Sequence, residues 1–140
     1  MKTGVLTVGD QSHTLADPAW FTTGLWEPAR GLLFRPRIRP GAALIIRTSG
    51  VHTWGMTYPL DLVLVDRHWN VLDVYEGWPP WRIGPQHRRA RYVVEMAPGS
   101  LAADPVAPGT HLRWEELRGV HAAWEVPVPL DVSPEQRDGT

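Results

Sequence analysis

The sequence predicts a mainly β fold: a single-domain antiparallel β-sandwich or distorted barrel of jelly-roll type, with one or two short helices. Fourteen prolines and thirteen glycines cut the 140 residues into short pieces. Few windows are long enough for a helix of ordinary length, and the apolar runs between the breaks have strand length. The 43% of apolar residues suffice for a core, and without cysteine its stability must come from packing.

Eight apolar runs, each bounded by Gly, Pro, Asn or Asp, are expected to form strands. They span residues 2–8, 42–47, 51–54, 60–65, 71–76, 92–96, 111–117 and 120–126. Two pairs of these runs are close enough in sequence to form hairpins. One would turn at residues 67–70 and the other near Arg118 and Gly119, so antiparallel pairing is expected.

Two helical segments are expected. The stretch from Glu27 to Phe34 has a proline at a first-turn position and an acidic residue at its start, both favourable at a helix N-terminus. A single helical turn is expected after Gly99, and Pro105 would stop it. From residue 127 onward periodicity is lost, so we expect one domain over residues 1–126 and a partly frayed C-terminal extension over 127–140.

Composition and residue patterns argue against several classes of function. The formal net charge of −1 provides no overall field that would attract nucleic acid or an anionic membrane. No segment has the length and hydrophobicity of a signal peptide core or a membrane span, which predicts a cytoplasmic protein. No His-x-His or His-x-x-x-His pair is present, and we predict neither a metal nor a cofactor.

Four blocks of sequence resemble the DUF192 family of uncharacterised bacterial and archaeal proteins. They are GLLFRPRI (31–38), GVHTWGMTYPLDLVLVD (50–66), RARYVVEMAPG (89–99) and PGTHLRW (108–114). The resemblance implies a compact β-sandwich or distorted barrel with a short helix near the first block. It implies no particular activity. One departure is Thr110, which stands where relatives have an aspartate after the glycine.

The second of these blocks contains the strongest chemical candidates. Alternation along a strand places His52, Trp54 and Met56 on one face, and Asp61 opens an apolar run where its carboxylate must be paired or hydrogen-bonded. Arg35 is the first candidate partner, with Arg47 or Arg91 as alternatives. One hypothesis is that Arg35, His52, Asp61 and Glu95 converge on a pocket walled by Trp54 and Met56. The alternative is that Asp61 anchors a turn and His52 is an ordinary strand residue.

Two further features are open to two interpretations each. The loop EGWPPWRIGP (76–85) carries Trp78 and Trp81, which could line a ligand or partner site or could fold back over the core. Arginines gather in residues 30–39 and 82–91, where they could hold single-stranded nucleic acid or could be solvated loop charges. Nucleic acid is the less favoured partner.

These observations favour a non-catalytic module that binds a small molecule or a protein partner near the central block and the tryptophan loop. The first alternative is a hydrolase that uses His52 or Asp61 as the base and Arg35 to orient an anionic group. The second alternative is nucleic-acid binding through the arginine-rich face. The oligomeric state and the ligand are left open.

Overall fold

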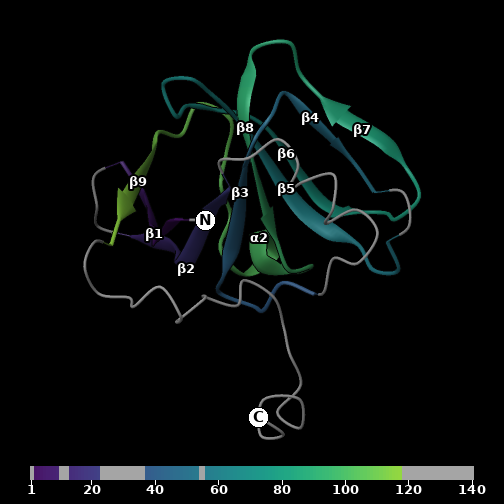
Figure 1. Cartoon of the computed structure of the whole chain (residues 1–140), viewed down its shortest axis with the longest axis horizontal. Coiled ribbons are helices and arrows are strands. Elements are labelled where there is room, and N and C mark those ends of the chain that lie inside the picture. The colour runs from purple at the N-terminus through teal and green to yellow at the C-terminus, as the bar shows by residue number, and fades with distance from the viewer. Residues whose placement is uncertain (1, 10–12, 23–36, 54–55, 118–140) are drawn as a thin grey trace, which may run out of the picture.

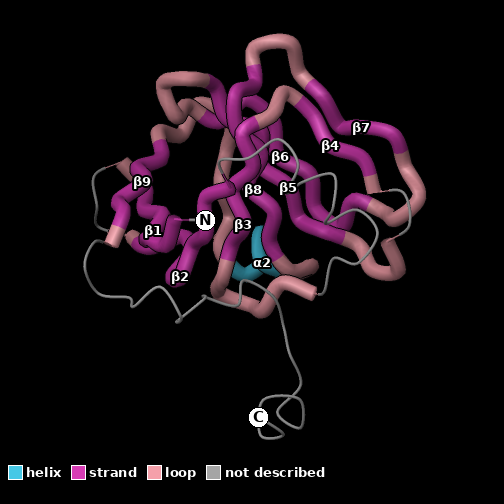
Figure 2. Tube along the Cα trace, in the orientation of Figure 1, coloured by secondary structure: helices cyan, strands magenta, loops and turns pink. Residues whose placement is uncertain are grey.

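The computed structural model describes residues 2–9, 13–22, 37–53 and 56–117, and confirms a mainly β fold (Figures 1 and 2). A seven-stranded, strongly curled sheet forms a half-barrel, accompanied by a two-stranded sheet and one short helix. The strands are β1 (Lys2–Val8), β2 (Thr14–Thr22), β3 (Ala43–Arg47), β4 (Gly50–His52), β5 (Leu60–Asp66), β6 (Val71–Trp78), β7 (Ile83–Gln86), β8 (Ala90–Met96) and β9 (Leu112–Glu116). The helix is α2 (Ser100–Ala103).

The strand order of the large sheet is β6-β5-β8-β3-β2-β1-β9, and β4 pairs with β7 in the small sheet. Pairing is antiparallel except between β2 and β3, which are parallel. The expected all-antiparallel arrangement therefore has one exception. Parallel neighbours need a long connection, and residues 23–42 between these two strands provide it.

Most of the expected elements match the structure closely. The first strand spans the predicted residues 2–8, the hairpin turn lies between β5 and β6, and the single turn after Gly99 is α2. Strands β2 and β7 were not predicted, because each contains a proline, which lacks the N–H needed for a regular ladder. Around Pro18 the β1–β2 register is irregular, between Gly4 and Leu6. The helix expected at 27–34 and the strand expected at 120–126 lie outside the described residues.

Two apolar layers cover the two faces of the large sheet. The layer inside the curl is formed mainly by Leu6, Ala43, Ile45, Val63, Val65, Val94, Met96, Leu101 and Leu112. The layer on the other face includes Trp20, Leu44, Ile46, Met56, Tyr58, Leu60, Leu62, Leu64 and Val93. Strand β5 contributes to both layers, which explains why its sequence is apolar without interruption after Asp61.

The two outer strands of the large sheet meet at one corner. Asn70 and His111 form an isolated bridge, and the backbone N–H of Leu112 donates to the carbonyl of Trp69 at 2.8 Å. Trp69 has a φ of 67° and stacks on Tyr92, with ring centroids 4.4 Å apart. These contacts draw the start of β6 towards the start of β9 and help to close the half-barrel.

The β5–β6 turn is organised by the carboxylate of Asp66. Its Oδ1 accepts the backbone N–H groups of His68 at 2.8 Å and Asn70 at 3.0 Å. Partial burial by itself would raise the pKa of Asp66, but the N–H groups of Asn70 and His68 outweigh it, and the pKa lies below the ordinary 3.8. The ionised form of Asp66 therefore stabilises this turn.

Within the described ranges, no helix has both the length and the apolar character needed to cross a membrane. The single described helix, α2, is only one turn long.

Candidate functional site

Asp61 is fully buried, and both of its carboxylate oxygens accept backbone hydrogen bonds. Oδ1 accepts the N–H of Gly77 in β6, and Oδ2 accepts the N–H of Leu101 in α2, each at 2.8 Å. The sequence analysis predicted that this carboxylate is either paired with a cation or hydrogen-bonded, and the structure shows hydrogen bonds from two backbone N–H groups. Arg35 lies outside the described residues. Arg47 at the end of β3 and Arg91 at the start of β8 are exposed and lie at the end of the sheet opposite to Asp61.

A bulge in β6 directs the Gly77 N–H at Asp61. Leu60 pairs with Trp78 and Leu62 pairs with Tyr75, so Glu76 and Gly77 together face Asp61. Gly77 has a φ of 63°, a backbone conformation that glycine adopts without steric cost. Gly77 thus allows the bulge that brings its N–H to Asp61.

Glu95 is also fully buried but lies on the opposite face of the sheet from Asp61. Residues in register on neighbouring strands share a face. Asp61 is in register with Met96, which belongs to the inner apolar layer. Glu95 is in register with Leu44 and Leu62, which belong to the outer layer. The structure therefore does not bring these two carboxylates together.

Of the remaining candidates in the central block, the structure describes Met56 and the backbone of His52. Met56 is 3% exposed and packs within that layer. The backbone of His52 belongs to β4 and pairs with Ile83. Arg35 and Trp54 lie outside the described residues, and the structure leaves the side chain of His52 undescribed.

The two tryptophans of the loop at 76–85 have different environments. Trp78 packs against the outer layer, edge-on to Tyr75 with ring centroids 5.2 Å apart. Partial burial and the neighbouring Asp73 carboxylate raise the pKa of Tyr75 above 10.0. Trp81 is 60% exposed and Ile83 is 79% exposed. One tryptophan thus covers the core and the other lies at the surface, and a binding role for either stays a prediction.

Thr53, which sequence reasoning did not single out, holds this loop in place. Its buried hydroxyl donates to the carbonyl of Pro79 at 2.8 Å and accepts the N–H of Arg82 at 2.9 Å. Its own carbonyl accepts the N–H of Trp81 at 2.8 Å. A threonine between alternating larger side chains gives no distinct sequence signal for this role.

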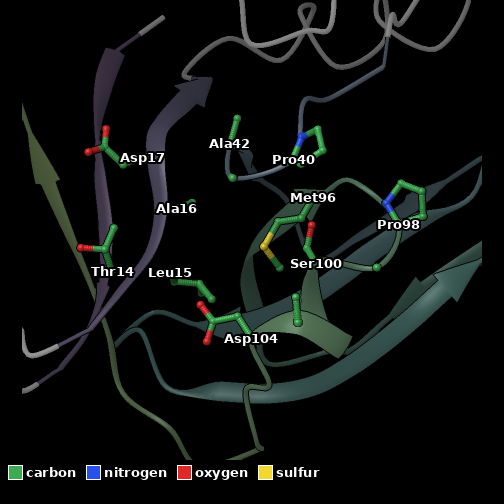
Figure 3. A pocket seen from close by; sticks show the side chains of 13 residues that line it. Thr14, Leu15, Ala16, Asp17, Pro40, Ala42, Met96, Pro98, Ser100 and Asp104 are labelled. Carbon is green, nitrogen blue, oxygen red and sulfur yellow. The ribbon is translucent and has the colours of Figure 1, made fainter.

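A pocket of about 470 Å³ lies between the start of β2, the approach to β3, the end of β8 and α2 (Figure 3). Its lining residues are Thr14, Leu15, Ala16, Asp17, Pro40, Gly41, Ala42, Met96, Pro98, Gly99, Ser100, Ala103 and Asp104. Thr14 and Asp17 come from β2 on one side, and Ser100 and Asp104 come from the helical segment on the other. None of the residues predicted from the central block lines it.

The polar groups of this pocket are two carboxylates and two hydroxyls. Ser100 Oγ donates its proton to the carbonyl of Ala97 at 2.6 Å, which leaves its lone pairs as acceptors. Asp104 Oδ1 lies 2.6 Å from Nε2 of His13, at the pocket margin. Among the described residues that line the pocket, none carries a positive charge. The pocket therefore offers mainly hydrogen-bond acceptors above an apolar floor.

Two Pro-Gly turns and Asp61 position the walls of the pocket. Gly41 and Gly99, with φ values of 87° and 91°, reverse the chain before β3 and after β8. Ala43 and Met96 are in register, so both turns lie at the same end of the sheet. Asp61 binds the first turn of α2 through Leu101, and so supports the pocket without lining it.

In the ranges that the structure describes, no three His, Asp or Glu side chains gather where a metal ion could be held.

Comparisons with known proteins identify a family from the sequence and, separately, two solved structures with a similar fold. The family model DUF192, described as "Uncharacterized ACR", matches residues 8–114. A putative transcription regulator from Sinorhizobium meliloti is 17% identical, with a TM-score of 0.66, over 81% of this chain and 92% of that one. A protein of unknown function from Novosphingobium aromaticivorans is 19% identical, with a TM-score of 0.63, over 80% of this chain and 84% of that one. No curated protein matches the chain.

Proposed function

The chain belongs to the DUF192 family of uncharacterised proteins, and for this member we propose a non-catalytic role: the domain binds a small molecule in the pocket between β2 and α2. The supporting observation is the pocket itself. Its volume of about 470 Å³ falls in the range of small-molecule sites. It combines an apolar floor with polar side chains at its margin.

The chemistry of the lining selects the class of ligand. Carboxylates only accept hydrogen bonds when ionised, and the hydroxyls of Thr14 and Ser100 add further acceptors. An anionic ligand would meet Asp17 and Asp104 and be repelled. The ligand we propose carries an ammonium group or several hydroxyl donors, together with an apolar part that contacts Leu15 and Met96.

A binding role is preferred over a hydrolase role because of the state of Asp61. A general base must come within hydrogen-bonding distance of the proton it abstracts. Asp61 is fully buried, and each of its oxygens already accepts an N–H. Catalysis by Asp61 with His52 and Arg35 would require this support to be given up.

The test compares two exposed alanines on α2. Ala103 lines the pocket, whereas Ala102, its neighbour on the same helix, does not. A collection of small amines and polyols is screened by thermal unfolding of the unmodified protein and of the variants Ala103→Tyr and Ala102→Tyr. We expect a compound that raises the midpoint of the unmodified protein and of Ala102→Tyr but has no effect on Ala103→Tyr, because the tyrosine fills the pocket.

Two outcomes would contradict the proposal. One is that no amine or polyol changes the unfolding midpoint of the unmodified protein. The other is that a compound stabilises Ala103→Tyr as much as Ala102→Tyr, which would place its site elsewhere.

A further inference from the structure

We infer that a second site, for a phosphate-type oxyanion, lies at the end of β8 opposite the α2 pocket. A hollow of about 560 Å³ is lined there by Ser49, Gln86, His87 and Arg88. The α2 pocket lies where β8 ends, whereas this hollow lies at the β7–β8 turn that precedes β8. Figure 1 shows this turn and α2 at opposite ends of β8. The two sites therefore occupy separate parts of the molecule.

Each residue that lines the hollow carries a hydrogen-bond donor. The guanidinium of Arg88 is permanently charged, and Ser49 and Gln86 contribute a hydroxyl and an amide. Nδ1 of His87 accepts the backbone N–H of Arg89 at 3.1 Å. This bond assigns the ring proton of neutral His87 to Nε2, which is then a donor. The polarity of this hollow is opposite to that of the α2 pocket.

The backbone fixes the lining residues relative to one another. The N–H of His87 donates to the carbonyl of Ser49 at 3.0 Å, which joins the segment before β4 to the segment after β7. The N–H of Ala90 donates to the carbonyl of His87 at 2.9 Å and closes the turn that carries Arg88 and Arg89. The residues that carry the donors are therefore connected by backbone hydrogen bonds rather than placed along a single long loop. This lowers the entropic cost of binding an anion.

The fold brings further positive charge to this end of the sheet. Arg89 and Arg91 follow Arg88 in the chain, and Arg47 is brought to this end of the sheet by its register with Tyr92. All four arginines are exposed. The ion pairs found among the described residues, Lys2 with Glu116 and His13 with Asp104, involve none of them.

The carboxylate of Asp66 also lies at this end of the sheet, but it already accepts hydrogen bonds. Asp66 is in register with Ala90, but its Oδ1 accepts the N–H groups of its own turn. Arg88 is the permanently charged side chain that lines the hollow, and Arg47, Arg89 and Arg91 add positive charge at the same end of the sheet. A phosphate-type oxyanion would be attracted by this charge and bound by the donors of the lining. Because the lining is confined to four residues, a small phosphate-bearing molecule fits this site better than a long nucleic-acid strand.

The experiment measures binding of pyrophosphate to the full chain by titration calorimetry at low ionic strength. Arg88→Gln removes the charge that lines the hollow, and Arg113→Gln removes an equally exposed charge on β9 as the matched control. We expect saturable binding that is about tenfold weaker in Arg88→Gln and unchanged in Arg113→Gln. Denaturant unfolding of each variant verifies that both are folded, and Ser49→Asp provides a second variant that repels the anion.

A single-stranded oligonucleotide without terminal phosphates is titrated in parallel. Binding of pyrophosphate with weaker or no binding of the oligonucleotide supports the proposal. Binding of the oligonucleotide alone would overturn it and would favour a nucleic-acid interface. No saturable pyrophosphate binding, or equal losses in Arg88→Gln and Arg113→Gln, would also overturn it. The variant Ala103→Tyr should bind pyrophosphate normally, so this site and the α2 pocket can fail independently.

Discussion

The backbone N–H of Leu101 donates to the carboxylate of Asp61 at 2.8 Å, across 40 positions of sequence. Through this bond the first turn of α2 is attached to β5. The other carboxylate oxygen attaches β6 through Gly77. Asp61 is thus the common support of three segments, one of which forms a wall of the proposed ligand pocket.

Replacing Asp61 with asparagine is expected to destabilise the domain strongly. An asparagine of the same shape would present its NH₂ group to one of the two buried N–H donors. Neither the NH₂ group nor that N–H would then have an acceptor. The expected loss in the free energy of unfolding is about 2–4 kcal/mol, measured by urea denaturation. Glu76→Gln, at an exposed neighbour of Gly77, is the control and should leave the free energy unchanged. Normal stability of Asp61→Asn would mean that the two N–H bonds contribute little, and would revive a site role for Asp61.

The stability of the domain is expected to fall in acid partly through Asp66. Its pKa in the folded protein lies below the ordinary 3.8, so ionised Asp66 stabilises the fold above pH 3.8, and this stabilisation is lost as the pH falls through the lowered pKa. Asp66→Asn keeps an acceptor oxygen for His68 and Asn70 but cannot ionise. We expect it to be less stable than the unmodified protein at pH 7 by about 1 kcal/mol, with the difference vanishing in strong acid.

Denaturant unfolding at a series of pH values measures this difference. A difference that stays constant from pH 7 into strong acid would refute the role of the Asp66 charge. Asp66→Ala, which also removes the acceptor oxygen, should be the less stable of the two variants at pH 7.

Gly77→Ala is expected to cost about 1 kcal/mol through backbone strain alone. A Cβ at this position would meet no atom within 4 Å, so the cost arises from the φ of 63°. Asparagine tolerates this conformation better than alanine. Gly77→Asn should therefore be more stable than Gly77→Ala in urea denaturation. The reverse order would show that strain at Gly77 does not determine the effect.

Gly4→Ala is expected to be far more damaging, for a different reason. A Cβ at Gly4 would lie 2.2 Å from the carbonyl oxygen of Glu115 and 2.6 Å from the ring of Trp114. Either β9 must move away from β1 or the pairing must break, at a cost of about 3 kcal/mol or more. Circular dichroism during thermal unfolding measures the effect. A midpoint equal to that of Gly77→Ala would contradict the close approach of the two strands.

The elements that the sequence predicted well are those with local signals. The apolar run after Asp61, the turn around residues 67–70 and the helical turn after Gly99 each follow from neighbouring residues. Strand β2 was missed because Pro18 interrupts it, and its partners lie in β1 and in the distant β3.

The pocket escaped prediction because it is assembled from segments separated by up to 90 residues. Its one sequence signal is a pair of Pro-Gly turns, at Pro40–Gly41 and Pro98–Gly99. That signal is informative only once β3 and β8 are known to be neighbours, since their register places both turns at one end of the sheet. The hydrogen bonds from two backbone N–H groups to Asp61 could not be predicted either. A sequence suggests which side chains could pair, but it does not reveal the bulge in β6 that directs the Gly77 N–H at Asp61.

The pairing of β1 with β9 has a consequence for biosynthesis. Gly4 in the first strand is in register with Glu116 in the last described one. On the ribosome, β1 can pair with β2 early, but its other edge has to await β9, and the sheet is incomplete until the whole DUF192 region has left the exit tunnel. Nascent chains stalled before residue 116 should therefore remain sensitive to protease, and β1 should become fully protected only after β9 has been released.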